Sequence, residues 1–134
     1  MPNGIALNKF VILVVEDDKF LLTLLAEKLK REGLLVISAE NGQEALVKMK
    51  GEPRPHIILL DLLPPILDGF EVLRTMQDDP DLKKIPVVVL SNLGQEEDVR
   101  RAKSFGVKDY LVKAYFTPGE IIEKVQTIIR SEYL

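Results

Sequence analysis

The sequence predicts an α/β fold in three layers, with a five-stranded parallel sheet between two layers of helices. Short, continuous apolar runs at 10–15, 57–60 and 87–90 are typical of strands that are buried on both faces, as in parallel sheets. Segments with apolar residues at helical spacing alternate with these runs. Strands that alternate with helices pack as right-handed crossovers on the two faces of one sheet.

The first half of the chain predicts two strands and two helices. The strand at 10–15 is followed by a helix whose apolar face consists of Phe20, Leu21, Leu24, Leu25 and Leu29. Gly33 is expected to end this helix, because glycine tolerates the left-handed conformation common at helix ends. Residues 34–39 predict the second strand, Asn41-Gly42 a turn, and residues 43–50 a short helix.

The second half repeats this alternation. A third strand at 57–60 precedes a helix that carries Phe70, Leu73 and Met76, and a fourth strand at 87–90 precedes a polar helix over 96–105. A fifth strand is predicted at 109–112. The last helix begins at Thr117-Pro118-Gly119-Glu120, a capping box with proline at the first helical position.

Composition excludes several classes of function. The 134 residues suit one domain, and 46% hydrophobic with 29% charged residues suits a compact core. The net charge of −3 leaves no basic field for nucleic acid or an anionic membrane surface. The absence of cysteine, with one histidine (His56), excludes disulfides, thiolate zinc sites and multi-histidine metal sites. No apolar run approaches the ~20 residues that cross a bilayer, and no signal peptide is recognisable, so we expect a cytoplasmic protein.

Polar residues stand where four of the predicted strands end, namely Glu16-Asp17-Asp18, Asp61, Ser91 and Lys113. Ligands of open α/β sheets bind at these carboxyl ends. Crowded carboxylates repel one another unless a cation neutralises them, and an all-oxygen cluster favours Mg²⁺. Such a site provides a carboxylate nucleophile, with a metal, a lysine and a hydroxyl to stabilise a transferring phosphoryl group. The simpler alternative, that an acidic residue only caps the next helix, applies to Asp18.

Residues 10–132 resemble the receiver domain of two-component response regulators. The resemblance is carried by four ordered motifs: VVEDD at 14–18, LLDLLPPILDGFEVL at 59–73, VVLS at 88–91 and GVKDYLVK at 106–113. Asp17 stands 44 residues before Asp61, Ser91 follows 30 residues later, and Lys113 another 22 residues on. The resemblance implies a flavodoxin-like sheet with strand order 2-1-3-4-5. Residues 1–8 are expected to form an N-terminal extension and residues 9–134 the receiver domain.

The resemblance also implies a phosphoacceptor and a metal site. Asp61 would receive a phosphoryl group from the histidine of a partner histidine kinase or of a phosphotransfer protein. Asp17 would bind Mg²⁺ directly and Glu16 through water, with Asp61 and the backbone carbonyl of Leu63 as further ligands. The chain would catalyse only its own phosphorylation and dephosphorylation, and would not be an enzyme in the usual sense.

Three further residues would respond to the phosphoryl group. Lys113 would pair with its oxygens, Ser91 would move to hydrogen-bond one of them, and Tyr110 would turn inward as Ser91 moves. This change would bias a surface made by the fourth helix, the fifth strand and the fifth helix. The implied partners are a downstream protein, or a second copy of the chain in a homodimer, with no direct contact to nucleic acid or membrane.

Departures from the family pattern leave alternatives open. Asn92 stands where the family has a small residue, and Ala114 where it has proline after a cis bond. A cis bond before a non-proline residue costs about 3–4 kcal/mol, so we predict a trans Lys113–Ala114 bond. The alternatives are a pseudo-receiver that acts as a constitutive interaction module, and a phosphatase with an aspartate nucleophile. Leu63 argues against the phosphatase, whose nucleophile motif is Asp-x-Asp. Because the sequence stops directly after the last helix, we expect a stand-alone receiver.

Overall fold

The computed structural model describes residues 10–62 and 68–134, so the extension predicted for residues 1–8 lies outside the described residues. The predicted class is confirmed: five parallel strands form one sheet in the order β2-β1-β3-β4-β5. The strands are β1 (Val11–Val15), β2 (Leu35–Ala39), β3 (Ile57–Leu60), β4 (Val87–Ser91) and β5 (Asp109–Val112). The helices are α1 (Lys19–Arg31), α2 (Gly42–Met49), α3 (Gly69–Gln77), α4 (Glu96–Ser104) and α5 (Pro118–Tyr133), with short 3-10 turns η2 (Leu82–Lys84) and η3 (Lys113–Tyr115).

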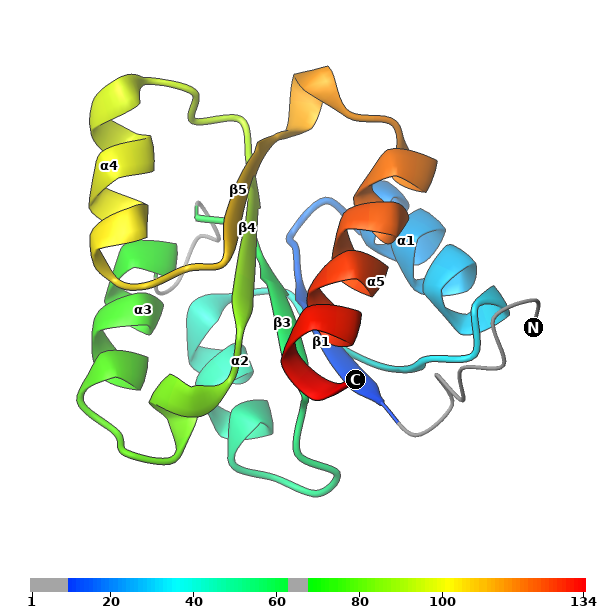
Figure 1. Cartoon of the computed structure of the whole chain (residues 1–134), viewed down its shortest axis with the longest axis horizontal. Helices are drawn as coiled ribbons and strands as arrows, with labels where there is room; N and C mark the ends of the chain where they lie inside the picture. The colour runs from blue at the N-terminus through cyan, green and yellow to red at the C-terminus, as the bar shows by residue number, and fades with distance from the viewer. Residues whose placement is uncertain (1–9, 63–67) are drawn as a thin grey trace.

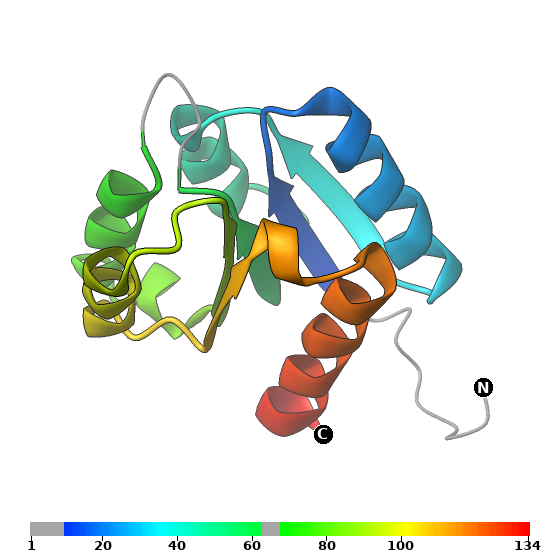
Figure 2. The same ribbon diagram turned by 90° about the horizontal axis from the view of Figure 1, so that it is seen from above.

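Helices cover both faces of the sheet. Figure 1 shows α1 and α5 on one face and α2, α3 and α4 on the other, and Figure 2 shows the same layers from above. Successive side chains of a strand point to opposite faces, so β1 contributes to two hydrophobic cores. Ile12 and Val14 pack with α1 and α5, whereas Leu13 and Val15 pack with the other three helices. This double burial explains why the inner strands β1, β3 and β4 are nearly continuous apolar runs.

Two helix ends form as predicted. Gly33 has a φ of 94° and follows the end of α1; its N–H donates to the Lys30 carbonyl and that of Leu34 to the Leu29 carbonyl. These two bonds satisfy carbonyls that the helix leaves free. At the start of α5, the Thr117 hydroxyl accepts from the N–H of Glu120, and the Glu120 carboxylate accepts from the N–H of Thr117.

The predicted turn at Asn41-Gly42 is wrong, because Gly42 is the first residue of α2. Asn41 Oδ1 accepts a hydrogen bond of 2.8 Å from the N–H of Glu44. Asparagine is among the best N-cap residues for the reason seen here, and the cap extends the helix one residue earlier than expected. The predicted trans Lys113–Ala114 bond is confirmed, since the cis peptide bond found among the described residues is Glu52–Pro53.

The parallel register places the carboxyl ends of the strands at one edge of the sheet. Val15 pairs with Leu60, and Ser91 with Val112, so the residues that follow these pairs emerge side by side. The opposite edge holds His56, whose Nδ1 accepts a hydrogen bond from the N–H of Val11. Among the described residues, no helix is both long and apolar enough to span a bilayer.

Candidate functional site

The ends of β1 and β3 position the acidic side chains. The Glu16 N–H donates to the Ala39 carbonyl at 2.9 Å, and the Asp61 N–H donates to the Val15 carbonyl at 3.0 Å. These backbone bonds continue the sheet for one residue past each strand. Glu16 and Asp61 are therefore held by the rigid sheet rather than by a free loop, in the position that the strand-end pattern predicts.

Three carboxylates meet at this edge. Oxygen atoms of Glu16, Asp17 and Asp61 all lie within 4.8 Å of one another. Glu16 and Asp61 are buried, with exposed fractions of 1% and 5%, whereas Asp17 is exposed. Carboxylates this close repel one another, and an all-oxygen donor set with one exposed member fits a hard divalent cation that keeps some of its water.

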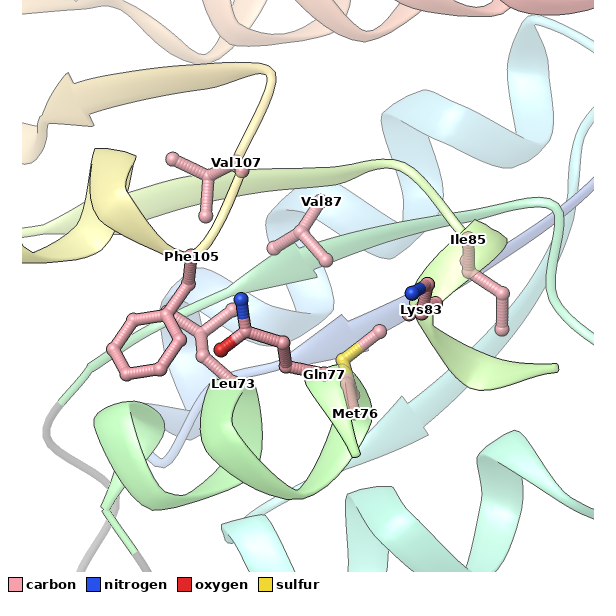
Figure 3. Close-up of a pocket in the computed structure, with 9 residues that line it drawn as sticks. Leu73, Met76, Gln77, Lys83, Ile85, Val87, Phe105 and Val107 are labelled. Carbon is pink, nitrogen blue, oxygen red and sulfur yellow. The ribbon is translucent and has the colours of Figure 1, made fainter. Parts of the chain in front are cut away.

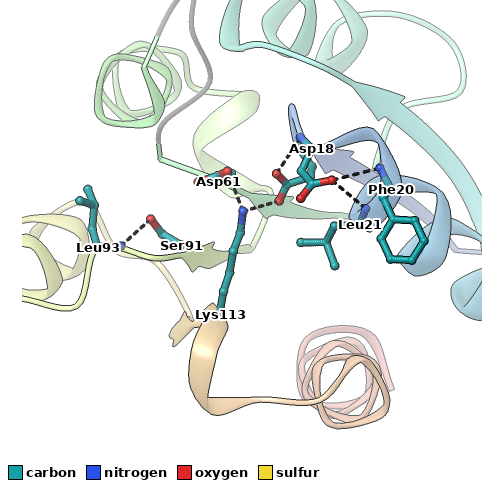
Figure 4. Close-up of polar contacts among 8 residues, drawn as sticks. Asp18, Phe20, Leu21, Asp61, Ser91, Leu93 and Lys113 are labelled. Atoms are coloured by element: carbon teal, nitrogen blue, oxygen red, sulfur yellow. Dashed lines mark hydrogen bonds and ion pairs between the residues drawn. The ribbon is translucent and has the colours of Figure 1, made fainter.

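Lys113 provides the positive charge of the site. Its Nζ lies 2.8 Å from Glu16 Oε1 and 3.0 Å from Asp61 Oδ2. Figure 4 shows the Lys113 side chain directed at Asp61. Burial by itself lowers the pKa of Lys113, but the hydrogen bonds to Glu16 and Asp61 outweigh burial and raise the pKa above its ordinary value. Lys113 is therefore fully charged at neutral pH and bridges two strand ends.

The pKa of Glu16 is strongly raised in this site. Burial raises the pKa of Glu16 to about 7, and the charge of Asp61 adds to the rise, while the hydrogen bonds from Lys113 and from the N–H of Asp18 oppose it. Its Oε2 accepts from that N–H at 3.1 Å. Both oxygens of Glu16 are thus engaged by donors of the protein.

Asp18 has the capping role that the simpler interpretation assigned to it. Its Oδ1 accepts hydrogen bonds from the N–H groups of Phe20 and Leu21 at 3.0 and 3.1 Å, at the start of α1 (Figure 4). An N-cap side chain satisfies N–H groups that have no partner within the helix. Asp18 nevertheless lines the same shallow pocket as Glu16, Asp17, Asp61, Asn92 and Lys113.

Ser91 and Tyr110, the two predicted switch residues, both bond to the backbone of Leu93. Ser91 is fully buried, and its Oγ accepts from the Leu93 N–H at 3.1 Å. The Tyr110 hydroxyl donates to the Leu93 carbonyl. Burial, followed by the nearby charge of Asp98, raises the pKa of Tyr110 above its ordinary value. The sequence held no signal for this role of Leu93, since both bonds use its backbone.

Gly69 is a second residue whose importance the sequence pattern did not reveal. A Cβ atom added to it would lie 2.5 Å from the Cα of Leu62 and 2.9 Å from the carbonyl oxygen of Asp61. Its N–H donates to the Leu62 carbonyl at 2.9 Å. The start of α3 therefore packs directly on the backbone that carries Asp61, and only glycine fits. The Leu63 carbonyl, a predicted metal ligand, lies outside the described residues.

Comparison with known proteins identifies the family. Residues 12–126 match the model of the response regulator receiver domain. The chain belongs to this family. Receiver domains are regulatory modules of two-component systems, not metabolic enzymes, and they interact with histidine kinases and downstream effectors. The resemblance that the four motifs indicated, and the strand order it implied, are both confirmed.

Two curated relatives of this receiver domain come from Bacillus subtilis. The chain is 37% identical over 119 residues to the alkaline phosphatase synthesis transcriptional regulatory protein PhoP, covering 89% of this chain and 48% of the relative. It is also 37% identical over 123 residues to the transcriptional regulatory protein ResD, covering 92% of this chain and 49% of the relative. The chain thus spans about half the length of the curated relatives it matches.

Two solved structures match the receiver domain over nearly their whole length. The Mn²⁺-bound response regulator Rcp1 is 39% identical, with a TM-score of 0.76, over 90% of this chain and 91% of that one. The phosphorylated cyanobacterial phytochrome response regulator RcpA is 35% identical with the same TM-score and coverage. Receivers similar to this one have therefore been seen with a divalent metal and with a phosphoryl group.

Proposed function

We propose that Asp61 accepts a phosphoryl group from the phosphohistidine of a partner histidine kinase or phosphotransfer protein. The observation that carries this proposal is the contact of one ammonium group, that of Lys113, with the carboxylates of both Asp61 and Glu16. In the transfer, an Asp61 oxygen bonds to phosphorus, the phosphorus–nitrogen bond to the donor breaks, and the released imidazole takes up a proton. The product is an acyl phosphate on Asp61.

The carboxylate cluster would hold Mg²⁺ for this reaction. Asp17 is exposed and suits a direct ligand, and Asp61 offers a second oxygen donor in the same cluster. Both oxygens of Glu16 already accept hydrogen bonds, which supports the expected contact through water. The Mn²⁺-bound form of Rcp1 supports a divalent metal in this kind of site. When bound, Mg²⁺ would neutralise negative charge on the phosphoryl oxygens and the carboxylates.

The residues around Asp61 favour the phosphorylated form. Lys113 already points at Asp61 and would retain its charge beside the added phosphoryl oxygens. Ser91 presents a buried hydroxyl at the end of the neighbouring strand. As Ser91 moves toward a phosphoryl oxygen, its hydroxyl would leave the N–H of Leu93, and Tyr110, which shares Leu93 as partner, would then move inward.

The output would be a change in the surface formed by α4, β5 and α5. Helix α4 is weakly anchored, because Ala102 is its one buried residue, so a shift at Leu93 and Tyr110 can reach it. We infer that this face binds a downstream protein or a second copy of the chain. We also infer that the protein acts in the cytoplasm, where ATP is available to a histidine kinase. The net charge of −3 supports a protein partner rather than nucleic acid.

The test measures the intact mass after incubation with acetyl phosphate, with Mg²⁺ or with excess chelator. The native chain should gain one phosphoryl group only with Mg²⁺, and Asp61→Asn should gain none. Asp18→Asn is the matched control, because it removes a charge from the same pocket while asparagine still caps α1; it should still be phosphorylated. No adduct on the folded native chain, or equal adducts on the native chain and Asp61→Asn, would refute the proposal.

A further inference from the structure

A pocket lies at the edge of the sheet opposite the acidic site. It has a volume of about 190 Å³ and is formed by the end of α3, the segment from η2 into β4, and the loop between α4 and β5 (Figure 3). Its lining residues are Leu73, Met76, Gln77, Lys83, Ile85, Val87, Phe105, Gly106 and Val107. Because β4 begins at Val87 and ends at Ser91, the pocket and the phosphorylation site are at opposite ends of one strand.

The base of the pocket is apolar, although polar atoms make up more of its exposed lining than apolar atoms do. Leu73, Met76 and Val87 are buried at its base, with exposed fractions of 3%, 3% and 5%, and Phe105 and Val107 form the wall on the α4 side. An engineered apolar cavity of roughly 150 Å³ is sufficient to bind benzene. The pocket therefore has room for one aromatic ring with a small substituent, one face of which would pack on this apolar base.

Two polar side chains, Lys83 and Gln77, give the pocket chemical selectivity. In Figure 3, the Gln77 amide lies within the ring of lining side chains, and Lys83 stands at the side of the pocket opposite Phe105. None of the nine lining residues carries a carboxylate, and none of the ion pairs found among the described residues includes Lys83. A cationic and an amide side chain beside an apolar base are complementary to a small anion whose remaining atoms are apolar.

Three acidic residues, Asp78, Asp79 and Asp81, precede η2, and the carboxylate of Asp79 contacts the backbone of this turn. Asp79 Oδ1 accepts hydrogen bonds from the N–H groups of Asp81 and Leu82 at 2.9 and 3.1 Å. These two bonds fix the start of the 3-10 turn that carries Lys83. Lys84, the next residue of the turn, does not line the pocket.

We propose that this pocket binds a small apolar carboxylate of about the size of benzoate. The ring would pack between Met76 and Phe105, and the carboxylate would accept hydrogen bonds from Lys83 and Gln77. Such a ligand would contact α3 and the loop after α4 together. It would thereby hold the end of α4, which contacts its neighbours through Ala102 and through Arg101, whose guanidinium carbon lies 4.0 Å from the centre of the Phe70 ring. The proposal does not depend on phosphorylation of Asp61.

The experiment titrates the ¹⁵N-labelled chain with benzoate, benzyl alcohol and benzylamine, which share a ring and differ in charge. The amide signals of Gly106 and Val107 report on the pocket, and that of Asp61 reports on the distant site. The variants are Lys83→Gln and, as a matched control, Lys84→Gln, which removes the same charge from the same turn outside the pocket.

We expect saturable shifts of the Gly106 and Val107 signals with benzoate, in the millimolar range, in the native chain and in Lys84→Gln. Lys83→Gln should weaken benzoate binding about 1.4- to fivefold, the range for one exposed ion pair. Benzyl alcohol should bind more weakly and benzylamine more weakly still. The proposal is overturned if the pocket signals do not respond, if the three ligands bind equally, or if Lys83→Gln and Lys84→Gln have the same affinity for benzoate.

Discussion

The ammonium nitrogen of Lys113 lies 3.0 Å from Oδ2 of Asp61, although 52 residues separate the two along the chain. The same nitrogen contacts Glu16, so one cation joins residues that follow β1, β3 and β5. Lys113 therefore has two opposed effects on the proposed reaction. It would stabilise negative charge on a phosphoryl group, and it would repel a divalent metal from the carboxylates.

Replacing Lys113 should separate these effects. Lys113→Ala should bind Mg²⁺ roughly tenfold more tightly, since a unit charge about 5 Å from a divalent ion repels it by about 1–2 kcal/mol even in water. The same variant should be phosphorylated much more slowly. Calorimetric titration with Mg²⁺ should be done near pH 8.5, because protonation of Glu16, with its pKa of about 7, competes with the metal.

Lys19→Ala is the control for this prediction, because Lys19 is an exposed cation that pairs with Glu40 at 3.9 Å. It should change the Mg²⁺ affinity far less than Lys113→Ala does. Weaker Mg²⁺ binding by Lys113→Ala would show that Lys113 organises the carboxylates more than it repels the metal.

The shared bonding of Ser91 and Tyr110 to Leu93 predicts how the switch is transmitted. Beryllofluoride with Mg²⁺ is a phosphoryl mimic, and it should shift the amide signals of Leu93 and Tyr110 in the native chain. In Ser91→Ala, the shift at Tyr110 should fall by more than half, because no hydroxyl can leave Leu93 for the mimic. NMR spectra of both proteins, with Ser104→Ala as a distant control, test this expectation. An undiminished shift at Tyr110 would exclude Ser91 as the link.

The close packing of Gly69 predicts that an added methyl group destabilises the fold far more at Gly69 than at Gly119. Gly69→Ala should lower the free energy of unfolding by about 1–3 kcal/mol, as overpacking does, because its Cβ would meet backbone atoms of Leu62 and Asp61. Gly119→Ala is the control, since the nearest atom to its Cβ would be Thr117 Oγ1 at 3.9 Å. Urea unfolding should show little change for Gly119→Ala, and equal losses in the two variants would contradict the packing.

The raised pKa of Tyr133 predicts that the folded chain loses stability at alkaline pH. Burial, with the charge of Glu132, raises the pKa of Tyr133 above its ordinary value, and its hydroxyl donates to the His56 carbonyl at 2.6 Å. The folded chain therefore keeps this proton to higher pH than the unfolded chain. The corresponding stability is fully present below pH 10 and is lost as the pH rises through the folded pKa.

Urea unfolding at about pH 8 and about pH 11 tests the contribution of Tyr133. Tyr133→Phe should lose less stability than the native chain between the two pH values, and at the lower pH it should be less stable by about 1 kcal/mol or less, the loss of one half-exposed hydrogen bond. Tyr115→Phe, at a side chain that is 76% exposed, is the control and should follow the native chain. If Tyr133→Phe also follows the native chain, Tyr133 does not set the alkaline limit.

The parts of the fold that follow from apolar periodicity were predictable. Strands that are buried on both faces stand out as unbroken runs, and the polar residues that follow the strands led to the prediction of Glu16, Asp61, Ser91 and Lys113 as site residues. The hydrogen bonds and packing contacts that backbone groups make at the site could not be predicted from the sequence. The two bonds to Leu93 and the packing of Gly69 on Leu62 depend on tertiary positions that no side-chain pattern encodes.

The error at Asn41-Gly42 has a local cause. Asparagine followed by glycine favours a tight turn in isolation, and the same asparagine side chain also caps a helix. Here the helix prevails because Ala45 and Met49 bury completely against the sheet. Burial of one helix face outweighs the local preference of two residues.

The most direct test of the central claim, an acyl phosphate on Asp61, needs no variant. The native chain is incubated with acetyl phosphate and Mg²⁺, treated with borohydride, which reduces an acyl phosphate to an alcohol, and digested for peptide mass spectrometry. We expect reduction at position 61 alone, as homoserine, and none when Mg²⁺ is chelated. Reduction at Asp17 or Asp18 instead, or no reduction at any carboxylate, would contradict the assignment of Asp61 as the phosphoacceptor.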